Sequence, residues 1–91
     1  MTKRVRVVIS GSVQGVGFRW YCREQALSRN VTGSVRNRPD GRVEAAFEGE
    51  GGAVDAVVAW CRTGPRGAEV SNVEVVEETP AGTKDFEITR S

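Results

Sequence analysis

The chain has 91 residues, of which 38% are hydrophobic and 27% are charged. That length suffices for one small domain with a single core, and we expect residues 1–91 to form one domain. Thirteen basic and twelve acidic residues are interspersed along the chain and leave a formal net charge of +1. This balance gives no indication of an extended surface for nucleic acid or for a membrane.

Features that are absent from the sequence bear on the cellular compartment and on possible metal sites. No apolar run approaches the roughly 20 residues that span a bilayer, and the opening residues have no secretory hydrophobic region, so we expect a cytoplasmic protein. The sequence contains no histidine, which excludes imidazole as a general base or as a zinc ligand. Cys22 and Cys61 lack metal spacing, and a disulfide between them requires that their two helices touch.

The first elements in chain order are a strand, a loop and a helix. Residues 4–9 are rich in β-branched side chains and predict the strand, while residues 18–30 contain neither proline nor glycine and predict the helix. From Gly11 to Arg19 the sequence is Gly-Ser-Val-Gln-Gly-Val-Gly-Phe-Arg. Glycines let several N–H groups converge ahead of a helix N-terminus, where the helix dipole is positive.

Arg19 lies in the first turn of this predicted helix, where a cation opposes the dipole and a bound anion removes the conflict. The loop therefore favours an oxyanion site. Taken alone, such a loop is more often a tight connection with a solvated arginine. The P-loop pattern fails because Val16 stands at its second glycine, and the dinucleotide pattern fails because Trp20 stands at its third.

Two further strands are predicted at residues 31–37 and 42–50, and the turn Pro39-Asp40-Gly41 predicts a hairpin between them. Apolar and polar residues alternate along the second of these strands, which indicates one buried face and one wet face. We assign to the wet side, without any chemical role, three acidic residues: Glu44, Glu48 and Glu50.

The rest of the chain predicts one helix and two strands. Apolar residues at positions i, i+3, i+4 and i+7 indicate an amphipathic helix over residues 53–62. Alternating valines predict a strand over residues 70–76, and Phe86 and Ile88 indicate a short final strand. We assign to the core or its rim the aromatic residues Trp20, Tyr21 and Trp60.

These elements follow the order β-α-β-β-α-β, with one short strand added at the end. The order predicts an α+β fold, a ferredoxin-like α/β sandwich whose two helices pack on one face of a mostly antiparallel sheet. In this fold the first two strands are parallel, so their C-terminal ends lie at the same end of the sheet.

Asn37 ends the second strand on the face of the apolar Val35, which predicts that it points toward the glycine loop. With the third strand between them, the two strand ends are about 10 Å apart, at roughly 4.8 Å per strand. Arg19 and Asn37 are then able to share a ligand. The alternative is that Asn37 hydrogen-bonds its own backbone before the turn.

Three motifs resemble the acylphosphatase family nearly from end to end. They are Gly-Ser-Val-Gln-Gly-Val-Gly-Phe-Arg, Val-Arg-Asn-Arg-Pro-Asp-Gly-Arg-Val-Glu and Gly-Pro-Arg-Gly-Ala-Glu-Val-Ser-Asn-Val-Glu-Val. The resemblance implies hydrolysis of small acyl phosphates to carboxylate and inorganic phosphate, without a metal or an organic cofactor. It also implies that inorganic phosphate binds as the product and competes with the substrate. We expect the protein to be a monomer.

By position, Arg19 resembles the family's catalytic arginine, and Asn37 resembles the asparagine that orients the attacking water. The resemblance implies that Arg19 binds the phosphoryl group together with loop amides, those of Gln14, Gly15, Val16, Gly17 and Phe18. Ser34 departs from the family, whose members often have tryptophan there, which bears on the packing beside the site.

Two other functions are compatible with the same predicted fold. An RNA-binding module of this topology requires aromatic residues on the exposed central strands, and the predicted central strands do not present them. Acylphosphatase-like domains also occur within larger carbamoyl-transfer proteins, but 91 residues leave no room for their remaining machinery.

Overall fold

The computed structural model describes residues 1–89, which form five strands and two helices. In chain order they are β1 (Thr2–Ser12), α1 (Phe18–Ser28), β2 (Thr32–Asn37), β3 (Val43–Glu50), α2 (Gly51–Cys61), β4 (Glu69–Glu78) and β5 (Phe86–Ile88). Neither helix in this part of the chain is long and apolar enough to cross a membrane.

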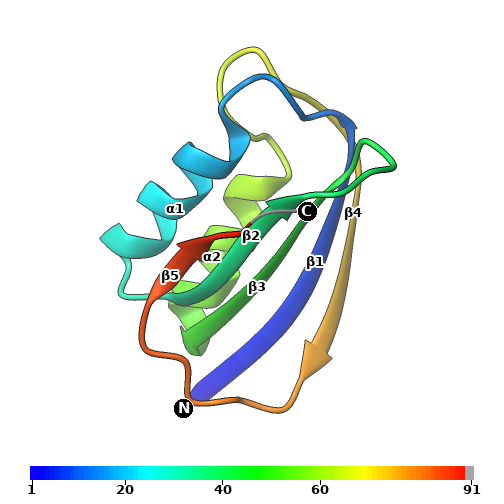
Figure 1. Cartoon of the computed structure of the whole chain (residues 1–91). Coiled ribbons are helices and arrows are strands. Elements are labelled where there is room, and N and C mark those ends of the chain that lie inside the picture. The colour runs from blue at the N-terminus through cyan, green and yellow to red at the C-terminus, as the bar shows by residue number, and fades with distance from the viewer. Residues whose placement is uncertain (90–91) are drawn as a thin grey trace.

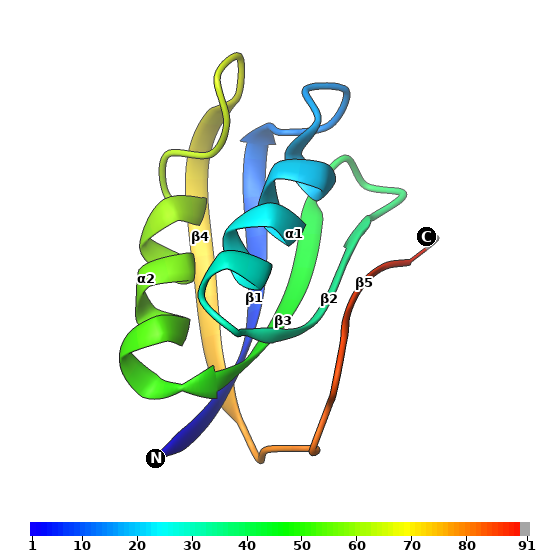
Figure 2. The same cartoon turned by 90° about the vertical axis from the view of Figure 1, so that its left-hand side faces the viewer.

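The strands form one sheet in the order β4-β1-β3-β2-β5. Both β1 and β2 pair with β3 in the antiparallel sense, so they are parallel to each other and their C-terminal ends lie at one end of the sheet. The short β5 pairs with β2 in the parallel sense. Both helices cover the same face of the sheet (Figures 1 and 2). The predicted ferredoxin-like sandwich is confirmed.

The core lies between this sheet face and the two helices. From the strands it takes the side chains that alternate inward, such as Val5, Val7 and Ile9 of β1. The amphipathic pattern of α2 is confirmed, because its predicted apolar residues are all buried: Val54, Val57, Val58 and Cys61. Cys22 of α1 and Cys61 are free thiols, both fully buried.

β5 joins this core beside a glycine on β2. Gly33 is paired with Phe47 of β3 on one side and with Phe86 of β5 on the other. Gly33 has a φ of +135°, and a Cβ atom there would collide with the carbonyl oxygen of Ala46, so this close approach of the strands requires glycine. The rings of Phe47 and Phe86 stack against each other, with centroids 5.9 Å apart and planes 17° apart, and Phe86 is buried at the edge of the sheet. Phe86 thereby fixes β5 beside β2.

The prediction that Gly11 belongs to the loop is wrong. Gly11 pairs with Val70 as part of β1, and the register between β1 and β4 shifts between Ser10 and Gly11. Gly11 has a φ of +123°, and a Cβ atom there would collide with the carbonyl oxygen of Glu69. Such a bulge bends the strand and increases its twist. It redirects the chain immediately before the loop.

The predicted end of the first helix is also wrong. α1 ends at Ser28 because Asn30 adopts a left-handed backbone with a φ of +57°. The N–H of Val31 then donates to the carbonyl oxygen of Ala26 at 2.9 Å, and the N–H of Asn30 donates to that of Leu27 at 3.2 Å. This pair of bonds satisfies the last carbonyls of the helix and directs the chain into β2.

The assignment of Glu48 to a wet face is wrong as well. Its side chain is buried on the sheet face opposite the helices, where its carboxylate accepts hydrogen bonds from the N–H of Ala81 at 2.9 Å and of Gly82 at 2.8 Å. The guanidinium of Arg4 donates a third bond at 3.0 Å. These bonds hold the connection between β4 and β5 against the sheet, which alternation along β3 alone could not reveal.

Candidate active site

The loop between β1 and α1 and the turn between β2 and β3 lie at the same end of the molecule (Figure 1). This follows from the parallel orientation of β1 and β2, which both end there. Figure 2 shows the loop next to the first turn of α1, with the β2–β3 turn beside it. Residues separated by about twenty positions in the sequence therefore meet at this end.

Glycines shape the backbone of the loop. Gly15 and Gly17 both have a φ of +76°, a left-handed conformation that residues with a Cβ atom rarely adopt. A Cβ on Gly15 would meet no atom within 4 Å, so this glycine is required by its backbone angle and not by crowding. Gly17 is the N-cap residue of α1.

The two helices differ at their N-termini. α2 is capped by Glu50, whose carboxylate accepts a hydrogen bond from the N–H of Ala53 at 3.2 Å. α1 has no side-chain cap, and no acidic residue lies in its first turn. The first N–H groups of α1 are therefore left for another acceptor, and the dipole makes this end attractive to an anion.

Arg19 adds a full positive charge to this end of α1. Its side chain is exposed, and within residues 1–89 it has no carboxylate within 4.0 Å. By contrast, Arg4 and Arg6 on the sheet both form ion pairs. An arginine that opposes the helix dipole without a carboxylate partner is arranged for an external anion.

Asn37 is half-buried at the end of β2, on the same face as the buried Val35. In the described residues its side chain forms no hydrogen bond with its own backbone or with the turn. The turn is instead held by Asp40, whose carboxylate accepts from the N–H of Arg42 at 3.1 Å. That bond, together with charge from Arg38 and Arg42, lowers the pKa of Asp40. The carboxamide of Asn37 thus remains available to a ligand.

Arg19 and Asn37 line one pocket of about 230 Å³. Of the other residues predicted to bind phosphate, Gly15, Gly17 and Phe18 line it too. Gln14 and Val16 do not: Val16 packs against the core, and the side chain of Gln14 points toward the β2–β3 turn.

Sequence reasoning missed three residues that line this pocket: Val13, Trp20 and Ile88. Ile88 comes from β5, and pairing of that strand with β2 had no signal in the sequence. We predicted that Trp20 and Tyr21 lie in the core or at its rim, and the assignment to the core is wrong because both side chains are exposed. Their rings pack edge-to-face, with centroids 4.9 Å apart. Trp60 does pack on the core, against Phe18.

A family model described as "Acylphosphatase" matches residues 5–88. The chain belongs to the acylphosphatase family. A protein named acylphosphatase from Rubrobacter xylanophilus is 59% identical over 88 residues, which cover 96% of this chain and 80% of the relative.

Solved structures of acylphosphatases have the same fold as this family member. The acylphosphatase from Bacillus subtilis superposes with a TM-score of 0.93 at 36% identity, over 98% of this chain and 99% of that one. Full-length HypF superposes with a TM-score of 0.91 at 29% identity, over 98% of this chain but only 12% of its own. The fold therefore also occurs as a small part of a much longer protein.

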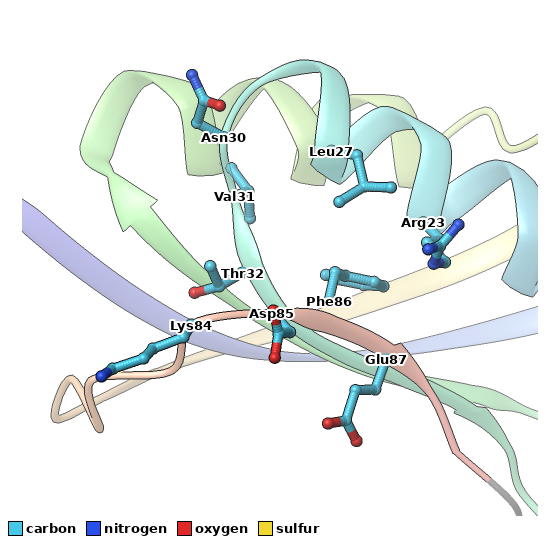
Figure 3. Close-up of a pocket in the computed structure, with 9 residues that line it drawn as sticks. All are labelled: Arg23, Leu27, Asn30, Val31, Thr32, Lys84, Asp85, Phe86 and Glu87. Atoms are coloured by element: carbon cyan, nitrogen blue, oxygen red, sulfur yellow. The ribbon is translucent and has the colours of Figure 1, made fainter.

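The protein also has a larger cavity, of about 600 Å³, which is lined by none of the predicted site residues. It lies between the second half of α1 and β5, and Figure 3 shows Leu27 of α1 and Phe86 of β5 facing each other across it. Basic and acidic side chains both line this cavity, among them Arg23, Lys84 and Asp85. The part of α1 that lines it is the C-terminal half and not the N-terminus, so size alone does not identify the site.

The sheet face opposite the helices is a layer of ion pairs. Arg6 binds Glu44 at 2.7 Å and Glu78 at 2.8 Å, and Arg4 binds Glu48 and Glu78. Within β1 and β3 this face carries no aromatic side chain. These two strands therefore lack the exposed aromatic side chains on which an RNA-binding module of this topology stacks bases.

Proposed function

We propose that the chain hydrolyses the carboxyl–phosphate bond of small acyl phosphates, with Arg19 and Asn37 as its catalytic residues. The observation that carries the assignment of residues is the pocket that both line, at the uncapped N-terminus of α1. The family to which the chain belongs supports the reaction itself.

In this proposal the phosphoryl group binds in the loop, where backbone amides donate to its oxygens. They are the amides of Gly15, Gly17 and Phe18, which line the pocket, and those of Gln14 and Val16, which belong to the same loop. The planar guanidinium of Arg19 donates two further bonds and neutralises charge that spreads over the equatorial oxygens in the transition state. These donors are fixed before the substrate arrives, so they cost little reorganisation during the reaction.

Asn37 orients the attacking water, because its carboxamide is able both to accept and to donate a hydrogen bond. The water oxygen forms a new bond to phosphorus, and the bond from phosphorus to the acyl oxygen breaks and releases the carboxylate. The residues that line the pocket include no carboxylate or thiol to act as a general base. The proton of the water passes to a phosphoryl oxygen of the substrate, since the carboxylate is a good leaving group and needs no protonation.

Several finer features belong to the same proposal. Inorganic phosphate is both the product and a competitive ligand, and the residues assigned here require no metal or organic cofactor. One chain supplies every assigned residue, which fits a monomer. The buried free thiols of Cys22 and Cys61 fit a reducing compartment such as the cytoplasm.

The test is release of inorganic phosphate from benzoyl phosphate by the pure protein, with and without EDTA. We expect turnover that EDTA does not change and that added inorganic phosphate inhibits competitively. The matched variants are Arg19→Ala and Arg29→Ala, because both remove one exposed arginine from α1 or its C-cap. Negligible phosphate release by the wild-type protein contradicts the proposed reaction, and equal loss in the two variants contradicts the role of Arg19.

A further inference from the structure

Large apolar side chains stand exposed beside the candidate active site. Trp20 is 54% exposed and Ile88 is 40% exposed, and both line the pocket of Arg19 and Asn37. Tyr21, next to Trp20, is 47% exposed. Seven large hydrophobic side chains of the described residues are exposed, and three of them lie here. Clustered exposed apolar surface of this kind marks a binding surface.

The fold holds these side chains in place without burying them. The rings of Trp20 and Tyr21 pack at an interplanar angle of 87°, and the Tyr21 ring lies so close to Gly17 that a Cβ there would be 3.3 Å from it. Ile88 is paired with Val35 on β2, two residues before Asn37. Trp20 therefore lies on the same helix as Arg19, and Ile88 lies on the strand next to the one that carries Asn37.

The pocket separates polar donors from an apolar wall. Loop amides and Arg19 form the part suited to the phosphoryl group, while Val13, Trp20 and Ile88 supply apolar surface. A volume of about 230 Å³ is below the several hundred typical of pockets that enclose a whole organic ligand. The acyl group of a substrate whose phosphoryl group binds the donors must therefore extend along the exposed wall.

We propose that Trp20 and Ile88 form the acyl-group subsite and favour aromatic or branched apolar acyl phosphates over acetyl phosphate. The inference rests on the proposed function, and it adds the class of acyl group that the site prefers. Aromatic contacts of this kind change binding by about 3- to 10-fold. Since the wall contacts only the acyl part, it discriminates between substrates without changing affinity for inorganic phosphate.

The experiment compares kcat and KM for benzoyl phosphate and acetyl phosphate in the wild type, Trp20→Ala, Trp20→Phe and Ile88→Ala. The ratio of the two kcat/KM values, taken relative to the wild type, removes the difference in intrinsic reactivity between the substrates. Leu27→Ala is the control, since Leu27 is also exposed on α1 but lines the other cavity (Figure 3).

In Trp20→Ala we expect kcat/KM for benzoyl phosphate to fall by about 3- to 10-fold, with less than about a 2-fold change for acetyl phosphate. Trp20→Phe retains most of the preference, Ile88→Ala loses part of it, and Leu27→Ala retains it all. Inhibition by inorganic phosphate stays the same throughout. Equal loss on both substrates, or no loss on either, overturns the subsite and leaves the hydrolase intact. A wild-type protein that hydrolyses neither substrate overturns the proposed function, and the subsite with it.

Discussion

The side-chain amide of Gln14 donates a hydrogen bond to the carbonyl oxygen of Arg38 at 2.8 Å. The same nitrogen donates to the carbonyl oxygen of Arg42 at 2.9 Å, so it bonds to residues on both sides of the β2–β3 turn. Arg38 directly follows Asn37. Gln14 therefore connects the loop that carries the proposed phosphate donors with the hairpin that carries the proposed water-orienting residue.

Replacement of Gln14 is expected to separate these two parts of the site. In Gln14→Ala the loop and the turn lose two hydrogen bonds, at a cost of about 1–2 kcal/mol in the free energy of unfolding, and kcat falls more than affinity for phosphate. Gln14→Glu has the same size but no N–H donor, and its charge faces two carbonyl oxygens, so it should not restore kcat. Urea denaturation and steady-state kinetics measure the two effects. A fully active Gln14→Glu protein contradicts the connection.

Arg19→Ala is expected to reduce kcat/KM by at least about 10²- to 10³-fold, which is typical for loss of one electrostatic donor. Inhibition by inorganic phosphate should weaken in parallel, because the same guanidinium binds the product. Arg19→Lys keeps the charge but not the planar fork, so it should recover only part of the activity. Phosphate-release kinetics with Arg29→Ala as control measure this, and near-wild-type turnover of Arg19→Ala excludes the assigned role.

Asn37→Ala is expected to lower kcat while the inhibition constant of inorganic phosphate stays close to the wild-type value. The reason is that Asn37 is assigned to the water and not to the phosphoryl group. Asn72→Ala, at an exposed asparagine of β4, is the control. A variant whose phosphate affinity falls while its kcat is unchanged would mean that Asn37 binds the phosphoryl group.

Most of the fold could be predicted from the sequence because its signals are local. Periodicity along single segments predicted the helices and strands, and the parallel strand ends predicted that Arg19 and Asn37 would lie at one end of the sheet. Contacts between segments distant in the sequence were not predictable in this way. Ile88 and Gln14 act across such contacts, and Glu48 is buried by a connection that alternation along β3 does not describe.

Gly15 and Gly41 offer a matched pair of substitutions. Their φ values are +76° and +91°, and a Cβ atom at either position would meet nothing within 4 Å. Alanine at each should cost about 1–2 kcal/mol of stability through backbone strain alone. Only Gly15→Ala should also lower kcat/KM, because only Gly15 lines the pocket with Arg19. Thermal unfolding together with kinetics separates the two effects, and equal activity loss in both variants contradicts the role of the loop.

Glu48 is expected to make stability depend on pH in the acid range. Hydrogen bonds from the N–H groups of Ala81 and Gly82, together with the bond from Arg4, lower the pKa of Glu48 below its ordinary value of 4.5. A carboxyl group whose pKa is lower in the folded state contributes stability above its unfolded pKa, and this contribution is lost as the pH falls through the folded pKa. Above pH 5 the contribution is complete.

Glu48→Gln should therefore destabilise the protein at neutral pH by about 1–3 kcal/mol, because it replaces a carboxylate that accepts three charge-assisted bonds. The difference in unfolding free energy between the wild type and the variant should shrink as the pH falls below 4.5. Taking the difference removes the contribution of Asp40, whose pKa is also lowered. Glu78 shares Arg4 with Glu48, so the measured difference includes the change in that pairing as well. Urea denaturation from pH 3 to pH 7 measures it. A difference that is constant over this range means that the charge of Glu48 does not hold the β4–β5 connection.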